Sequence, residues 1–102
     1  MAEHSQLYDY YVVGDSPEWQ ERKRRYALKH EKRCKACLTR YSVTLHHRRY
    51  DNLGHEPDRD LRWMCVKHHN LLHQIEKLTP LNIAQATWLV ILSIRAIGRL
   101  HP

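Results

Sequence analysis

The sequence predicts an α+β domain in which a short two-stranded hairpin lies between helices. Two segments, residues 42–46 and 61–65, are rich in strand-forming residues and are separated by a loop rich in turn residues. A helix-start signal precedes the first segment, and a stretch without Gly or Pro follows the second. A chain of 102 residues has room for one core, so we treat residues 1–102 as a single domain.

The first helix is expected to begin at Ser16. Ser16 is a suitable N-cap, Pro17 suits the first helical position, and Glu18 favours the positive end of the helix dipole. We expect this helix to end near His30. Residues 1–15 show no clear period and are expected to form an irregular arm.

The hairpin is expected to continue directly into a second helix. The strand over residues 42–46 alternates, the following loop contains Asn-Leu-Gly and Glu-Pro-Asp, and the strand over residues 61–65 returns. Residues 66–77 then have a helical pattern. The first helix, the hairpin and this second helix together make up residues 16–77.

A final helix is expected over residues 79–99, opened by Thr79 and Pro80. Its apolar residues cover more than one face, and such a helix has to be buried. It therefore covers the small domain, pairs with a second copy of the chain or docks on another protein. The longest apolar run, residues 88–92, is far short of the ~20 residues that span a bilayer, so no membrane contact is expected.

Positive charge is concentrated in one part of the chain. Residues 22–49 contain eleven Lys or Arg and a single acidic residue, Glu31, whereas the remainder is mildly acidic. Such a stripe is typical of a polyanion-binding face, and a solvated helix face is the alternative. The candidate nucleic-acid contacts are Arg22, Arg25, Lys32, Arg33, Lys35, Arg48 and Arg49.

The three cysteines are best explained as metal ligands. The opening MAEHSQLYDY has no apolar core of a signal peptide, so we expect a cytoplasmic, non-secreted protein in a reducing environment. Cys34 and Cys37 have the spacing of a zinc knuckle, and Cys65 and His68 repeat it. Together they form a Cys3His set for a structural Zn²⁺, with three buried free cysteines as the alternative.

Further histidines point to a second metal. His69 and His73 are four residues apart and share one face of a helix. Either His46 or His47 can supply a third nitrogen, and the other is then placed as a base. Three protein ligands with open positions are typical of a catalytic metal. The alternative is that these histidines are surface residues.

The residues of the expected hairpin and of the helix after it resemble a known family. The segment LHHRRYDNLGHEPDRDLRWMCVKHHNLLH is similar to the HNH endonucleases, the ββα-metal nucleases, in the branch with a zinc-binding CxxC pair on each side of the motif. The segment SPEWQERKRRYALKHEKRCKAC is similar to the helix that often precedes it. The resemblance covers about residues 16–75. It implies a small ββα-metal core with a zinc knuckle, preceded by one helix and followed by the long C-terminal helix.

The resemblance also implies roles for individual residues. His47 corresponds to the general base that activates water, and the ligands of the catalytic ion are His46, His69 and His73. Asp60 stands at the catalytic-site position that is usually Asn and that ties the loop and orients the base. His68 stands where the second CxxC pair normally ends in Cys, and sequence alone leaves an exchange of roles between His68 and His69 open.

The activity implied by the resemblance is metal-dependent hydrolysis of DNA phosphodiester bonds. We expect double-stranded DNA as substrate, weak sequence preference, one catalytic divalent ion (Mg²⁺, Mn²⁺, Ni²⁺ or Zn²⁺) and a bacterial or phage-infected cell as the setting. Two alternatives stay open. One is a catalytically inactive, zinc-stabilised nucleic-acid-binding module, and the other is a protein-interaction domain with two cross-braced zinc sites.

Overall fold

The computed structural model describes the backbone of residues 6–100 and the side chains of residues 6–97. It is a mixed structure of helices and one two-stranded antiparallel sheet, which confirms the α+β class. Within the described residues, no helix has the length and apolar character needed to cross a bilayer. In chain order the elements are α1 (Gln6–Tyr8), the π-helical η1 (Asp9–Val13), α2 (Pro17–Lys29), β1 (Val43–His47), the 3-10 helix η2 (Asp58–Asp60), β2 (Leu61–Cys65), α3 (Val66–Leu78) and α4 (Ile83–Leu100).

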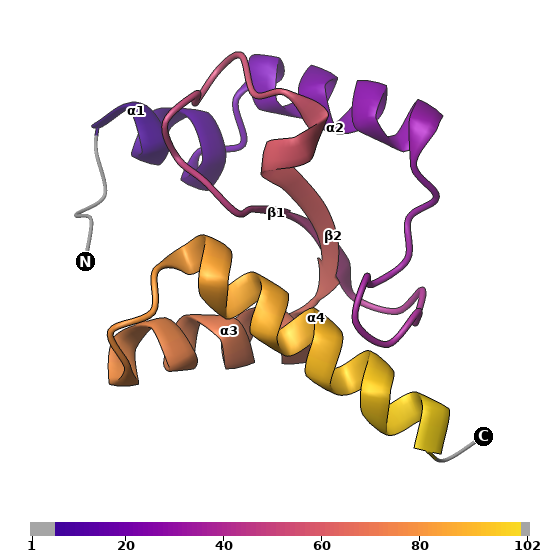
Figure 1. Ribbon diagram of the computed structural model, residues 1–102. Coiled ribbons are helices and arrows are strands. Elements are labelled where there is room, and N and C mark those ends of the chain that lie inside the picture. Colours follow the sequence, from indigo (N-terminus) through magenta and orange to yellow (C-terminus); the bar gives the residue numbers. More distant parts are fainter. Residues whose placement is uncertain (1–5, 101–102) are drawn as a thin grey trace.

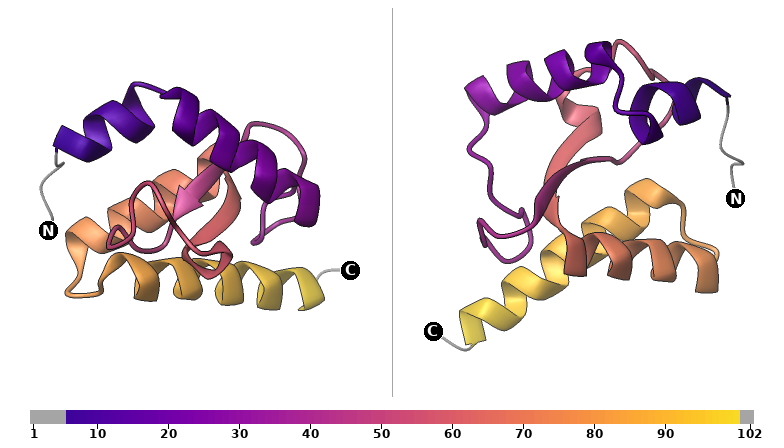
Figure 2. Two further views of the ribbon diagram at one scale, coloured as in Figure 1. Left: turned by 90° about the horizontal axis from the view of Figure 1, so that it is seen from above. Right: turned by 180° about the vertical axis from the view of Figure 1, so that it is seen from behind.

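The hairpin lies between two helical layers. Figure 1 shows α2 on one side of the strands and the pair α3 and α4 on the other, and the rear view in Figure 2 shows the same order. The strands pair from Val43 opposite Cys65 to His47 opposite Leu61. Both faces of this small sheet are therefore covered by helices.

Alternation along β1 sends neighbouring side chains to different layers. Towards α2, the ring of Trp63 lies 5.6 Å from that of Tyr26, and the ring of His47 lies 4.7 Å from that of Trp19. His46 points the other way and forms a hydrogen bond to α4. The two adjacent histidines thus approach different helices.

The start of α2 is confirmed. The Oγ of Ser16 accepts a hydrogen bond from the backbone N–H of Trp19 at 3.2 Å, and Pro17 is the first helical residue. The helix ends at Lys29, with His30 in extended geometry as its C-cap. The local capping chemistry was therefore sufficient to locate the start, and the expected end near His30 is also confirmed.

The irregular arm expected over residues 1–15 is wrong for residues 6–13, which are helical in α1 and η1. Tyr11 is only 2% exposed, and its hydroxyl donates to Glu56 at 2.9 Å. This contact is made across the fold, so no local sequence pattern predicts the helix. Residues 1–5 lie outside the described residues.

The last helix begins at Ile83, so the expected start at Thr79 is wrong by several residues. Asn82 Oδ1 accepts from the N–H of Gln85 at 2.8 Å, and the Gln85 side chain accepts from the N–H of Asn82 at 2.9 Å. This reciprocal capping box sets the start of α4. Thr79 is instead the C-cap of α3, and Pro80 lies in the link between the two helices.

Arg22 joins α2 to the loop that precedes β2. Its guanidinium donates to the carbonyl of Glu56 at 2.9 and 3.1 Å and pairs with Asp58 at 2.5 Å. The residue is buried. The guanidinium of Arg22 is therefore engaged within the fold as a structural cation, and its role as a nucleic-acid contact stays a prediction.

Replacing Arg22 by Ala should lower the free energy of unfolding by about 2 kcal/mol, because a buried carbonyl and a partly buried carboxylate lose their donor. Arg25→Ala is the matched control, since Arg25 is exposed on the same helix and lies 3.7 Å from Glu21. Urea unfolding monitored by circular dichroism measures both. Equal midpoints for the two variants would contradict the assignment.

Candidate metal centres

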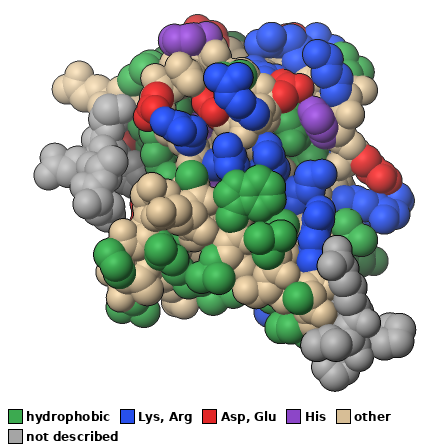
Figure 3. Space-filling model, viewed as in Figure 1, with side chains coloured by type: hydrophobic (Ala, Val, Ile, Leu, Met, Phe, Trp, Pro, Cys, Tyr) green, Lys and Arg blue, Asp and Glu red, His purple; other side chains and the backbone are tan. Residues whose placement is uncertain are grey.

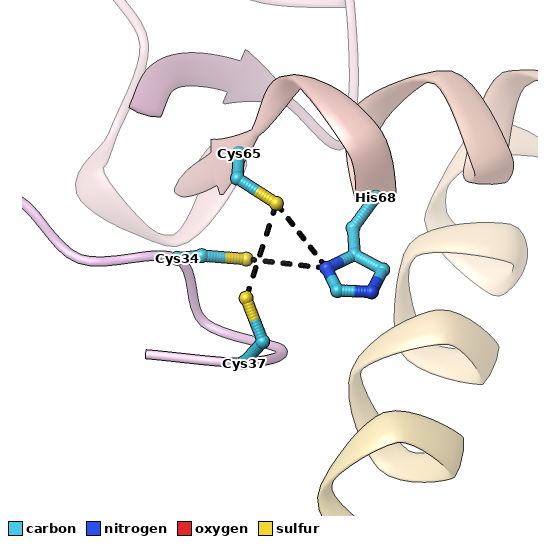
Figure 4. Close-up of side chains that lie close together, drawn as sticks. All are labelled: Cys34, Cys37, Cys65 and His68. Atoms are coloured by element: carbon cyan, nitrogen blue, oxygen red, sulfur yellow. Dashed lines mark hydrogen bonds between the residues drawn. The ribbon is translucent and has the colours of Figure 1, made fainter. Parts of the chain in front are cut away.

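Three cysteines and one histidine converge on a common centre. The ligand atoms of Cys34, Cys37, Cys65 and His68 all lie within 4.8 Å of one another, and Figure 4 shows the four side chains pointing together. Cys65 Sγ lies 3.2 Å from His68 Nδ1, and Cys37 Sγ lies 3.9 Å from Cys65 Sγ. Tetrahedral ligands at about 2.3 Å from zinc are roughly 3.8 Å apart, so this set could hold a structural metal such as zinc.

Local hydrogen bonds build the first half of the cluster. The N–H of Cys34 donates to Thr39 at 3.0 Å, and the carbonyl of Cys34 accepts from Leu38 at 2.8 Å. Leu38 has a φ of 66°, the left-handed conformation that closes the turn. The N–H of Lys35 donates to Trp63 in β2 at 2.9 Å, which attaches the knuckle to the hairpin.

The pKa values of two thiols of the cluster are shifted in opposite directions. Although burial raises the pKa of Cys34, nearby backbone N–H groups lower it overall, which favours the thiolate. Burial, followed by the neighbouring thiols, raises the pKa of Cys37 to about 11. The second thiolate thus forms readily only when a positive ion offsets the negative charge already present.

A second cluster joins the end of β1 to α3. The nitrogens of His46, His69 and His73 lie within 4.8 Å of one another and could hold an ion. The Nε2 atoms of His69 and His73 are 3.1 Å apart, and the ring centre of His46 lies 5.0 Å from that of His69. The structure places His68 with the cysteines and His69 with the histidines, which settles their division between the two clusters.

Hydrogen bonds hold two of these imidazoles in defined tautomers. The hydroxyl of Thr87 donates to the carbonyl of Ile83 at 2.6 Å, so it accepts from His46 Nε2 at 3.0 Å. The Nδ1 of His46 then keeps its lone pair. Glu76 Oε1 lies 3.3 Å from His73 Nδ1 and frees its Nε2 in the same way. Metal-binding histidines are typically oriented by such partners.

The electrostatics of the cluster keep two of its histidines neutral. Burial, and then the neighbouring His69 and His73, lower the pKa of His46 well below its usual value. Burial and His73 lower the pKa of His69 to about 4. Both rings are therefore unprotonated near pH 7, which is the form that binds a metal ion.

His47 is held by a buried carboxylate. Its Nε2 lies 2.5 Å from Glu56 Oε2, and the hydroxyl of Tyr11 donates to Glu56 Oε1 at 2.9 Å. Although burial raises the pKa of Glu56, the hydrogen bonds from His47, from the backbone and from Tyr11 lower it overall. An ionised Glu56 fixes the proton of His47 on Nε2 and leaves Nδ1 free to accept one.

Asp60 has a different position from Glu56. It is buried, and its Oδ2 accepts from the side-chain amide of Asn52 at 2.9 Å, while its carbonyl accepts from the N–H of Arg48. Asp60 thus ties the loop. The carboxylate that bonds His47 is Glu56, a role that the sequence reasoning did not assign to it. The sequence shows that the loop contains carboxylates, but it does not tell which of them reaches His47.

The two adjacent histidines, His46 and His47, line the same cavity. His46 and His47 both line a space of about 270 Å³, together with Tyr8, Tyr50 and His69. His47 is buried between aromatic rings, with Trp19 at 4.7 Å and Tyr50 at 5.9 Å. The cavity is therefore bordered by His46 and His69 of the histidine cluster and by the carboxylate-held imidazole of His47.

Most of the predicted nucleic-acid contacts are neutralised by neighbouring groups. Four of the seven form ion pairs, namely Arg22, Arg25, Arg33 and Arg49 with Asp58, Glu21, Glu31 and Asp51. The ammonium of Lys32 lies 5.5 Å from the ring centre of Trp63. Among residues 6–97, three of the seven have no carboxylate within ion-pair distance, namely Lys32, Lys35 and Arg48, and the guanidinium of Arg48 lies 5.7 Å from the ring centre of Trp88.

Comparisons of this chain with protein-family models, with curated proteins and with solved structures find no match.

Cys34→Ser should abolish tight zinc binding by the cysteine cluster and lower the melting temperature by many degrees, because a structural zinc site contributes directly to folding. Metal content after dialysis and thermal unfolding measure the effect. His73→Ala is the control, since it leaves the four ligands of the cysteine cluster in place. A fully stable Cys34→Ser protein with unchanged zinc content would overturn the structural role.

Thr87→Val should weaken divalent-metal binding by the three histidines about 10-fold to 100-fold, because His46 loses the acceptor that fixes its tautomer. Thr87→Ser keeps the hydroxyl and should bind nearly as the parent does. Calorimetric titration of zinc-loaded protein with Ni²⁺ gives both affinities. If Val and Ser variants bind equally, Thr87 does not orient His46.

Proposed function

We propose that this chain is a metal-dependent endonuclease of the HNH type, which hydrolyses phosphodiester bonds of DNA. The observation that carries the proposal is the cavity shared by His46 and His47, with a three-histidine cluster on one side and a carboxylate-held imidazole on the other. The β1–β2–α3 arrangement is compatible with a ββα-metal core.

In this proposal His47 is the general base. Glu56 holds its Nε2–H, so Nδ1 accepts the proton from a water molecule that attacks phosphorus. Tyr11 holds Glu56 in turn. The buried position of the three groups keeps the imidazole in one orientation, which is the requirement for rapid proton transfer.

The catalytic ion would be held by His46, His69 and His73. Such an ion supplies electrostatic stabilisation of the charge that develops on the phosphate and on the leaving oxygen. The residues present a neutral, nitrogen-only donor set. Imidazole suits Zn²⁺ and Ni²⁺ better than Mg²⁺, which favours oxygen ligands.

A catalytically inactive nucleic-acid-binding module is the second candidate. The observation that favours it is the burial of His47, which is 3% exposed. A base that water cannot reach does no chemistry, although the fold and the cysteine cluster would remain. A two-zinc interaction domain fits less well, because the second cluster has three ligands among residues 6–97 and leaves His47 paired with Glu56.

His47→Ala should reduce nicking of supercoiled plasmid by at least about 100-fold while zinc content and DNA affinity persist, because only the proton acceptor is removed. Glu56→Gln should also slow nicking, since the amide cannot fix the tautomer as a carboxylate does. His55→Ala, an exposed histidine of the same loop, is the matched control. The assay is run with Mg²⁺, Mn²⁺, Ni²⁺ and Zn²⁺. Absence of nicking by the parent protein with every ion would favour the inactive module.

A further inference from the structure

A second cavity, of about 310 Å³, lies where α4 crosses β2 and the end of the loop. It shares no lining residue with the histidine cavity. Its walls carry an exposed indole and several cations, namely Trp88, Lys35, Arg59, Arg62 and Arg95. Figure 3, which looks onto the α4 side of the molecule, shows a band of Lys and Arg side chains bordering hydrophobic ones. We call this cavity the Trp88 groove.

Backbone carbonyls hold two cations of the groove, Arg62 and Arg95. Arg62 Nη1 donates to the carbonyls of Leu61 at 2.6 Å and Arg59 at 3.1 Å, and Arg95 Nε donates to that of Lys35 at 2.9 Å. Carbonyls orient a guanidinium without neutralising its charge. Among residues 6–97, no carboxylate lies within ion-pair distance of Lys35, Arg59, Arg62, Arg95 or the adjacent Arg48.

Among the described residues, the groove wall contains one acidic residue, Asp58, and its carboxylate already has partners. Asp58 pairs with Arg22 at 2.5 Å and with His30 at 3.0 Å. On α2, by contrast, Arg24 and Arg25 both pair with Glu21. Uncompensated positive charge is therefore concentrated around the groove rather than along the helix with the densest run of basic residues, and such a place attracts a polyanion.

An aromatic platform lies among these charges. Trp88 is 43% exposed, and the guanidinium carbons of Arg48 and Arg62 lie 5.7 and 5.8 Å from its ring centre. Its neighbour Thr87 is fully buried, so the backbone beneath the indole is fixed. Cations beside an exposed aromatic ring are the combination by which proteins bind unpaired nucleotides. An acidic peptide would use the cations but not the indole.

We propose that the Trp88 groove binds a single-stranded segment of nucleic acid, with phosphates on Arg59, Arg62, Arg95 and Lys35 and a base stacked on Trp88. The proposal deepens the proposed nuclease function, on which it rests for the class of ligand. It implies a substrate that has an unpaired stretch in addition to the bond that is cleaved. Binding at the groove requires no chemistry in the histidine cavity.

Tryptophan fluorescence gives a direct test. Trp19 and Trp63 are 3% and 5% exposed, so quenching by an added ligand reports on Trp88. Zinc-loaded full chain, without further divalent metal added, is titrated with oligothymidylate. We expect saturable quenching and an affinity that falls with salt, with a log-log slope of about −3 for four phosphate contacts.

Variants locate the binding site. Trp88→Ala should weaken binding of a labelled oligothymidylate roughly 5-fold to 150-fold by anisotropy, and Trp88→Phe should restore much of it. The Arg59→Ala, Arg95→Ala double variant should flatten the salt slope by about 1.4. The controls are Leu92→Ala, an exposed apolar residue of α4, and Arg24→Ala, an exposed cation outside the groove, and neither should change binding. Circular dichroism verifies that each variant is folded.

Three results would overturn the proposal. These are no quenching by oligothymidylate, equal binding by Trp88→Ala and the parent, and tighter binding of polyglutamate than of oligothymidylate, which would make the groove a site for acidic peptides. Because binding is measured without cleavage, loss of plasmid nicking alone would count against the proposed enzyme and not against the groove.

Discussion

The pleat of β1 is the constraint on which the rest of the site depends. Consecutive residues of a strand point to opposite faces, so His46 and His47 are separated by one peptide bond yet approach different helical layers. His46 meets α3 and α4, and His47 meets α2. The register with β2 fixes which histidine faces which helical layer, and a shift of one residue would exchange the two faces. The cysteine cluster lies at the end of the same strand pair, where Cys65 pairs with Val43.

Local rules predicted the parts of the molecule whose partners are near in sequence. The cap formed by Ser16, the two strands and the ligand pairs that end in Cys37 and His68 follow from residue type and spacing. The grouping of His69 with His73 also follows, because residues four apart share a helix face. These features need no knowledge of the tertiary fold.

The parts that sequence could not supply depend on side chains that meet across the fold. Tyr11 reaches Glu56 and turns an apparently irregular segment into an ordered helix. Arg22 is buried, and its guanidinium donates to the loop carbonyl of Glu56, so this cation adds little to the basic surface. The densest run of cations in the sequence lies in α2 and its flanks, but ion pairs there offset much of its positive charge. The unpaired cations come partly from residues such as Arg62, which the count did not include.

The hydrogen bond between His46 and Thr87 makes the histidine cluster depend on the last helix of the chain. The three histidines of the second cluster all lie before residue 75, but the hydroxyl that accepts the hydrogen bond from His46 Nε2 comes from α4. The next residue, Trp88, belongs to the other cavity. A shortened protein that stops before Ile83 would retain both clusters and His47 while leaving the Nε2–H of His46 without its acceptor. The part of the chain that positions the three histidines therefore extends at least to Thr87, well past the last of the histidines themselves.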